Sequence, residues 1–111
     1  MTIEQVSFQL ILHAGNSKSF SMEGIKLAYE NHFDEAAQKI EEANEELTIA
    51  HKSQYDLLSD YSSGKGVELD ILLVHAQDHV TSAALMLDLA KEIINLNKKI
   101  YLAEQKGGEA K

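Results

Sequence analysis

The 111-residue sequence contains no cysteine, proline or tryptophan, and all ten of its basic residues are lysine. The absence of cysteine excludes disulfides and thiol chemistry, and it is compatible with a reducing cytoplasm. No apolar run approaches the ~20 residues that a membrane-spanning helix needs, and the N-terminus has no basic-then-apolar signal pattern. We therefore expect one cytoplasmic domain that does not insert into a membrane.

Basic residues are also scarce relative to acidic ones, which gives a formal net charge of −8. Phosphate backbones are bound by concentrated basic surfaces, so this composition argues against a nucleic-acid partner. The acidic residues are densest at Glu41-Glu42 and Glu45-Glu46, which we interpret as a solvated helix face. A protein partner with a basic rim is compatible with such a charge.

Apolar residues recur with a period near 3.6 in three segments, and strand-like alternation is not convincing anywhere. The predicted helices cover residues 2–30, 31–61 and 68–104, with Asn31 as the N-cap of the second and a turn at 62–66. Gly15-Asn16-Ser17 is predicted either to bend the first helix or to allow a close helix crossing. The fold class is therefore all-α, an antiparallel up-down-up three-helix bundle in one domain over residues 1–104. Residues 105–111 are predicted to be a disordered tail.

The third predicted helix carries a polar stripe within an otherwise apolar sequence. His75, Asp78, His79 and Ser82 stand at positions i, i+3, i+4 and i+7, which share one helix face. Polar groups in such a setting cost stability unless they are paired or used. The stripe is therefore where we expect the chemistry.

Spacing alone leaves three interpretations of this stripe. The histidines could be half-buried structural side chains that satisfy local hydrogen bonds. Two histidines at i and i+4 could bind a metal ion, although the Glu that usually follows the first histidine in zinc sites of this type is Ala76 here. One imidazole could instead be a nucleophile that Asp78 or His79 orients.

Four further polar residues have less certain roles in the sequence. His13 lies beside the apolar face of the first helix and is predicted to be a partly buried structural imidazole. His51 and Gln54 are either boundary residues or part of the site, because the end of the second helix lies near the start of the third. Gln77 is about 200° around the helix from His75, so it cannot line the same pocket within one subunit.

Three sequence blocks together resemble a known family. Residues 73–79 read Leu-Val-His-Ala-Gln-Asp-His, residues 14–19 read Ala-Gly-Asn-Ser-Lys-Ser, and residues 50–54 read Ala-His-Lys-Ser-Gln. In order and separation they are similar to the lactose/cellobiose-specific IIA component of the phosphoenolpyruvate-dependent sugar phosphotransferase system. The resemblance covers the chain up to about residue 104.

The resemblance implies a phosphocarrier rather than a sugar-binding protein. His75 would accept a phosphoryl group from the phosphohistidine of HPr and pass it to a cysteine of the cognate IIB component. His79 would assist. The relay would support uptake and phosphorylation of a β-linked disaccharide of the cellobiose, lactose or chitobiose type, and the sequence does not indicate which.

The resemblance also implies a homotrimer in which Asp78 from three subunits meets on the axis. There it would hold Mg²⁺ or another divalent cation, which would neutralise the carboxylates. Two other classes of function stay open at this point. One is a non-enzymatic helical protein–protein adaptor, and the other is a His/Asp metal-binding helical bundle.

Overall fold

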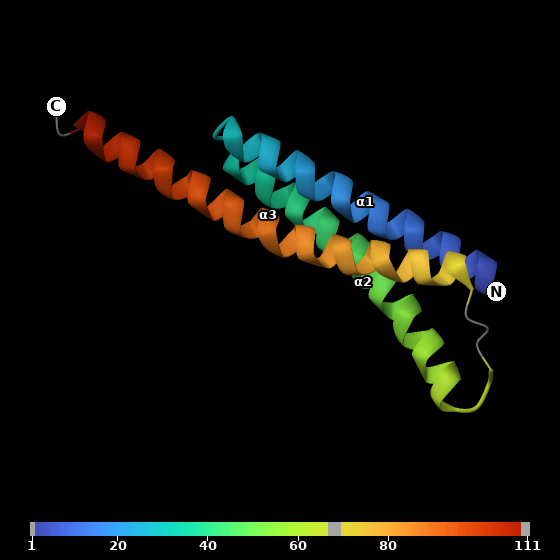
Figure 1. Ribbon diagram of the computed structural model, residues 1–111. Helices are drawn as coiled ribbons and strands as arrows, with labels where there is room; N and C mark the ends of the chain where they lie inside the picture. The colour runs from blue at the N-terminus through green and yellow to red at the C-terminus, as the bar shows by residue number, and fades with distance from the viewer. Residues whose placement is uncertain (1, 67–69, 110–111) are drawn as a thin grey trace.

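Three long α-helices joined by short connections form an elongated bundle of 68 × 20 × 19 Å (Figure 1). The computed structural model describes residues 2–66 and 70–109. Helix α1 spans Ile3–Tyr29, α2 spans Phe33–Ser62 and α3 spans Ile71–Glu109. They run up, down and up, so the predicted all-α three-helix architecture is confirmed. None of the helices in these described ranges is both long and apolar enough to cross a bilayer.

Side chains cap the N-terminal ends of the first and third helices. At α1, Thr2 Oγ1 accepts a hydrogen bond from the Gln5 backbone N–H at 3.1 Å, and Gln5 Oε1 accepts one from the Thr2 N–H at 2.9 Å. At α3, the Asp70 carboxylate accepts from the Leu73 N–H at 2.7 Å. These bonds satisfy N–H groups that have no partner within the first turn. The predicted start of the third helix at Glu68 lies outside the described residues.

Asn31 ends the first helix, and the prediction that it caps the second is wrong. Its φ of 64° is left-handed, whereas an N-cap residue has extended backbone. The Asn31 N–H donates to Ala28 O at 3.1 Å and the His32 N–H donates to Leu27 O at 2.9 Å. This is the Schellman pattern, in which asparagine is one of the few non-glycine residues that adopt the left-handed position readily. The N-cap of α2 is His32, which makes no side-chain cap hydrogen bond.

The third helix continues beyond its predicted end at Glu104. Residues 105–109, predicted to be disordered, form its last turn and a half, and residues 110–111 lie outside the described part of the chain. Gly107 and Gly108 lower helix propensity by about 1 kcal/mol each, but unlike proline they neither clash with the preceding turn nor remove an N–H. The hydrogen-bond ladder of α3 therefore extends through them.

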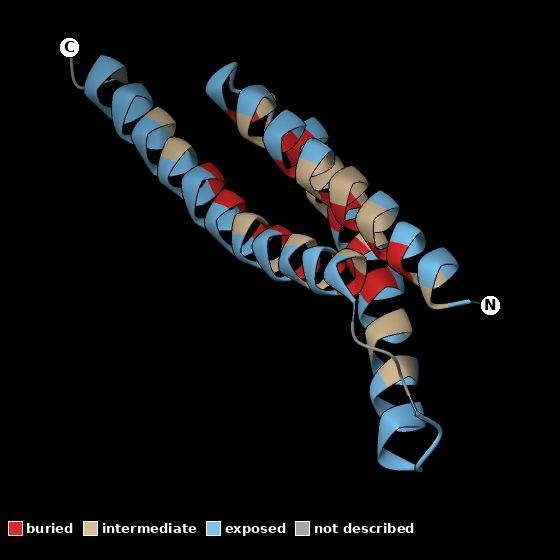
Figure 2. Cartoon of the chain, turned by 45° about the vertical axis from the view of Figure 1, so that its right-hand side comes forward, coloured by how far each residue is buried: buried red, intermediate tan, exposed pale blue. Residues whose placement is uncertain are grey.

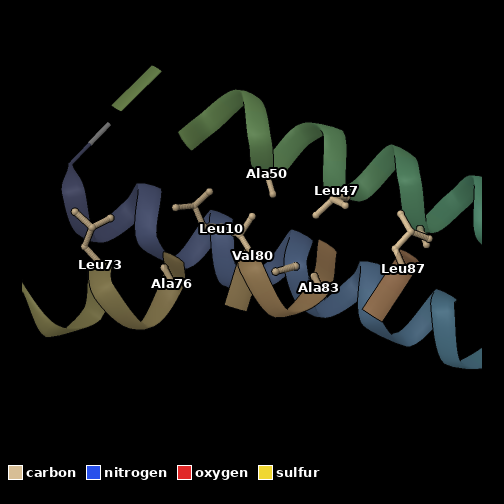
Figure 3. Packing of buried hydrophobic residues seen from close by; sticks show 10 residues of the cluster. Leu10, Leu47, Ala50, Leu73, Ala76, Val80, Ala83 and Leu87 are labelled. Atoms are coloured by element: carbon tan, nitrogen blue, oxygen red, sulfur yellow. The ribbon is translucent and has the colours of Figure 1, made fainter. Parts of the chain in front are cut away.

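The core follows the apolar stripes that the sequence predicts. Buried positions along α1 and α3 are separated alternately by three and four residues, a spacing typical of helices that wind around each other. Large side chains from all three helices interdigitate with small ones along this seam (Figure 3). The main cluster consists of Leu10, Ala14, Ala43, Leu47, Ala50, Leu73, Ala76, Val80, Ala83 and Leu87.

Helix α1 packs along both other helices, while α2 and α3 contact each other least. The last turns of α2 diverge from the bundle, and Figure 2 shows that these turns and the C-terminal half of α3 are mostly exposed. The divergence opens one face of the N-terminal half of α3. The opened face is the one that carries Val74 and Gln77.

Small residues let α1 and α2 approach closely. Ser17 is fully buried, and its hydroxyl donates to the Ala43 carbonyl across the helix pair at 2.9 Å. Gly24 faces the Ala36 carbonyl oxygen, and a Cβ there would lie 3.3 Å from it. Helix α1 runs unbroken through residues 15–17, so of the two predicted outcomes for that cluster the close crossing is the one observed.

Two glycines of α1 are expected to respond oppositely to alanine. At Gly15 no atom lies within 4 Å of the added Cβ, so Gly15→Ala should stabilise the protein by about 0.5–1 kcal/mol through helix propensity. At Gly24 the added methyl would lie 3.2 Å from Ile40 Cδ1 as well as close to the Ala36 carbonyl. Overpacking costs of about 1–3 kcal/mol should then make Gly24→Ala net destabilising by about 1 kcal/mol. Urea unfolding of both variants measures the difference, and a Gly24→Ala gain equal to that of Gly15→Ala would contradict the close crossing.

Candidate functional site

The candidate site is built on the second and third turns of α3. Leu73 and Ala76 are buried in the core and fix the rotation of the helix, since residues on one helix face move together. His75 is therefore turned toward solvent and His79, one turn later, lies half-buried toward α1. Asp70 holds the first turn through its cap. The N-terminal cap at Asp70 and the buried side chains of Leu73 and Ala76 together fix the backbone around His75.

The two imidazoles contact each other directly. Nε2 of His79 lies 3.1 Å from Nε2 of His75, and the ring centroids are 4.5 Å apart with the planes at 88°. This distance is that of a hydrogen bond, which needs one donor nitrogen and one acceptor nitrogen. The sequence left Asp78 and His79 open as the residue that orients His75, and in the structure His79 makes this contact.

Lys18 of α1 completes a row of three side chains. Its ammonium nitrogen lies 3.2 Å from Nδ1 of His79, so both ring nitrogens of His79 have a partner. Lys18 belongs to the sequence block at residues 14–19, but the sequence alone indicates no role for it. The contact joins residues 61 positions apart, and only the register between α1 and α3 brings them together.

The electrostatic surroundings disfavour a second positive charge in this row. Burial lowers the pKa of His79, and the neighbouring charges of Lys18 and His75 lower it further, while Asp78 acts in the opposite direction. The lowered pKa favours the neutral form of the His79 ring over its protonated form.

Asp78 and Ser82, the other members of the predicted stripe, lie apart from the histidine pair. Ser82 donates its hydroxyl hydrogen bond to the backbone carbonyl of His79 at 3.0 Å. Asp78 is exposed and points to the outer face of α3, opposite the core. Six large apolar residues on that outer face are each more than half exposed: Ile71, Val74, Leu85, Leu89, Leu96 and Ile100. We call this set with Asp78 the outer stripe of α3.

Gln77 faces the other flank of α3, as predicted. The amide of Gln54 donates to Gln77 Oε1 there, and both line a groove of about 710 Å³ between the diverging end of α2 and the start of α3. His51 and Tyr55 line the same groove. Within one chain, His51 and Gln54 therefore lie across α3 from His75 rather than beside it.

His13 is the partly buried structural imidazole that the sequence predicts. Its side chain is 19% exposed, with Nδ1 2.5 Å from Glu46 Oε2 and Nε2 3.2 Å from Gln9 Oε1. Asn16 also donates to Glu46, at 3.0 Å. Glu46 is therefore half-buried and ties α1 to α2, which corrects the interpretation of the whole glutamate run as a solvated face. Glu41 and Glu45 are exposed as expected.

Comparison with known proteins identifies the family to which this chain belongs. The family model described as "PTS system, Lactose/Cellobiose specific IIA subunit" matches residues 5–98. The chain belongs to this family. It is thus a phosphotransfer component of a sugar phosphotransferase system, and the family resemblance seen in its three sequence blocks is confirmed.

Individual IIA proteins are similar over nearly the whole length. The lichenan-specific phosphotransferase enzyme IIA component of Bacillus subtilis (strain 168) is 44% identical over 105 residues, covering 95% of this chain and 94% of that protein. The crystal structure of the cellobiose-specific enzyme IIA of Bacillus anthracis has a TM-score of 0.89 at 39% identity, covering 92% of this chain and 94% of that one. The IIA(Chitobiose) chain in its solution complex with HPr, from Escherichia coli, has a TM-score of 0.80 at 27% identity, covering 91% and 98%.

The three blocks of this IIA chain converge on the N-terminal half of α3. Residues 73–79 carry the histidine pair, residues 14–19 supply Lys18 on one flank, and residues 50–54 supply Gln54 on the other. The blocks are far apart in sequence, and the up-down-up topology brings them to one end of the bundle.

Within residues 2–66 and 70–109, no group of three or more His, Cys, Asp or Glu side chains is placed to hold a metal ion. Asp78 is the residue for which the family resemblance implies metal binding, and its carboxylate is a suitable hard ligand for Mg²⁺. One carboxylate does not make such a site. Metal binding at Asp78 would need further ligands from outside these described residues.

Proposed function

We propose that this IIA protein is a phosphohistidine relay in which His75 accepts a phosphoryl group from phospho-HPr. His75 then passes the group to a cysteine of the cognate IIB component. The observation that carries the proposal is the exposed imidazole of His75, whose Nε2 lies 3.1 Å from Nε2 of His79. The similarity to the E. coli IIA(Chitobiose) chain, which was solved in complex with HPr, supports HPr as the donor.

The other histidines are less suited to this role. Both ring nitrogens of His79 are occupied, and both of His13 are too. His32 lies at the connection between α1 and α2, and His51 belongs to α2 on the opposite flank of α3. His75 combines exposure with an orienting partner, which are the two properties that a protein-to-protein relay needs.

Each transfer exchanges one bond to phosphorus for another. The lone pair of a His75 ring nitrogen forms the new N–P bond, and the N–P bond of the donor breaks with its electron pair returning to the donor imidazole. In the second transfer, a thiolate of IIB forms an S–P bond while the bond to His75 breaks. Phosphoryl transfer depends mainly on positioning and on stabilising the charge of the phosphoryl oxygens. An N–H of His79, one turn along the helix, is placed to donate to such an oxygen.

The two partners must reach the same nitrogen, so they are expected to use one surface in turn. That surface is the flank of α3 that carries His75 and His79, with the neighbouring turns of α1. The relay would support uptake and phosphorylation of a β-linked disaccharide of the cellobiose, lactose or chitobiose type. The similar IIA proteins are named for lichenan, lactose and cellobiose. These names support a β-linked sugar as the transported class without selecting one sugar. A relay between these partners would act in the cytoplasm, which is the location predicted from the sequence.

We further propose a homotrimer that is closed by the outer stripe of α3. Six apolar side chains that are each more than half exposed on one face are typical of an interface rather than a solvated surface. Asp78 lies within this stripe, so three copies packed through it would place three carboxylates on the axis. Mg²⁺ or another divalent cation bound by the three Asp78 side chains would neutralise their repulsion.

Incubation of the purified chain with phosphoenolpyruvate, enzyme I and HPr tests the relay. A relay should gain about 80 Da, one phosphoryl group, in the intact mass. A non-enzymatic adaptor or a metal-binding bundle would gain nothing. An unchanged mass with an active enzyme I and HPr would therefore reject the proposed function.

A further inference from the structure

Lys18 has a partner that is unusual for a lysine in so acidic a protein. Its side chain is half-buried against α3, and within residues 2–66 and 70–109 no carboxylate lies within 4.0 Å of its ammonium nitrogen. Its hydrogen-bond partner there is Nδ1 of His79, at 3.2 Å. Ordering a lysine side chain costs rotamer entropy. Because no carboxylate pairs with Lys18 there, an ion pair does not account for the ordered position of its side chain. The hydrogen bond to His79 is the polar contact that holds it.

The chemistry of the three groups fixes the direction of both hydrogen bonds. An ammonium group donates and never accepts, so Nδ1 of His79 must carry a lone pair. A neutral imidazole has one proton, which must then be on Nε2. That N–H points at Nε2 of His75, 3.1 Å away, which must accept. The opposite direction would leave the His79 ring without a proton on either nitrogen.

We propose that Lys18 is a positioning residue of the relay: it holds the proton of His79 on Nε2 and so directs one N–H donor at the acceptor nitrogen of His75. A role for Lys18 in phosphoryl transfer rests on the proposed function. The direction of the two hydrogen bonds does not depend on that function. Lys18 acts through His79 and does not itself touch His75.

The arrangement fixes the tautomer of the nucleophile, and the one lone pair of Nε2 accepts the His79 N–H until the reaction begins. With its Nε2 accepting, His75 carries its own proton on Nδ1 and a lone pair on Nε2. When the lone pair forms the N–P bond, the N–P bond of the donor breaks and no proton has to move. The Nε2–H of His79 loses its acceptor as the bond forms and can turn to an oxygen of the arriving phosphoryl group. The positive charge of Lys18 behind the ring strengthens this donor for a negatively charged acceptor.

The test compares three variants of the full-length chain. Lys18→Met keeps most of the length of the side chain and removes the donor. Lys18→Arg keeps a donor, and Lys26→Met removes an exposed lysine from the same helix as a control. Long-range ¹H–¹⁵N spectra of histidine-labelled protein at neutral pH report which ring nitrogen carries the proton. Wild type, Lys26→Met and Lys18→Arg should show His79 with its proton on Nε2 and His75 with its proton on Nδ1. In Lys18→Met both rings should shift toward mixed tautomers.

Transfer from phospho-HPr supplies the second measurement. Lys18→Met should lower kcat roughly tenfold to a hundredfold, the range for a lost charge-assisted hydrogen bond, with little change in KM. Lys18→Arg should restore most of the rate. Unchanged tautomers in a folded Lys18→Met protein would overturn the inference, whatever the rate. If wild type accepts no phosphoryl group but its tautomers respond to Lys18→Met, the proposed function fails while the positioning by Lys18 stands.

Discussion

Replacing His75 by alanine is expected to abolish phosphoryl acceptance completely. The side chain is exposed and its removal leaves no cavity in the core, so His75→Ala should keep the helical content and melting temperature of the wild type. With phosphoenolpyruvate, enzyme I and HPr, the variant should gain no mass. The loss would be of the nucleophile itself, which no neighbouring group can replace.

His79→Ala is the matched comparison for this loss. It removes the ring that holds Nε2 of His75 but leaves the nucleophile in place. The variant should therefore still reach full stoichiometry, at a rate roughly tenfold to a hundredfold below that of wild type. Full phosphorylation of His75→Ala would show that another histidine carries the group, and the assignment of His75 would be wrong.

Removal of divalent cations is expected to destabilise the assembled protein strongly. Three Asp78 carboxylates brought together without an ion repel each other, and each unpaired buried charge costs several kcal/mol. An ion that binds only the trimer stabilises it by mass action, by about 2.7 kcal/mol when its concentration is 100 times its dissociation constant. EDTA should therefore lower the melting temperature and promote dissociation, as measured by calorimetry and by sedimentation.

Asp78→Leu separates the ion from the interface. Leucine adds an apolar side chain of similar size to the outer stripe of α3 and removes the repelling charge. The variant should form a trimer whose melting temperature does not respond to EDTA, and His75 should still accept a phosphoryl group. A monomeric wild type would contradict the trimer. A trimer that ignores EDTA, together with dissociation of Asp78→Leu, would contradict the axial ion.

The helices and their core faces could be predicted because they depend on local spacing. The three-and-four separation of apolar residues requires no knowledge of the partner helix, and residues with this spacing, such as Leu10, Val80 and Leu87, form the core. The position of His75 relative to Gln77 follows from the same rule, since 3.6 residues per turn sets the angle between them. The family resemblance then directed attention to His75 without any structural information.

Features that depend on two elements at once could not be predicted in this way. The contact between Lys18 and His79 requires the axial register of α1 against α3, and the pairing of His13 with Glu46 requires that of α1 against α2. Asn31 was misassigned because its residue type favours both a helix start and a left-handed helix end. The φ angle of 64° decides between them.

The central claim is that Nε2 of His75 carries the phosphoryl group in the wild-type protein. The most direct measurement is a phosphorus–nitrogen coupling experiment on histidine-labelled wild type, phosphorylated through enzyme I and HPr and kept at neutral to alkaline pH. We predict coupling to phosphorus at Nε2 of His75, with none at the other four histidines. Coupling at any ring nitrogen of His13, His32, His51 or His79 would contradict this account.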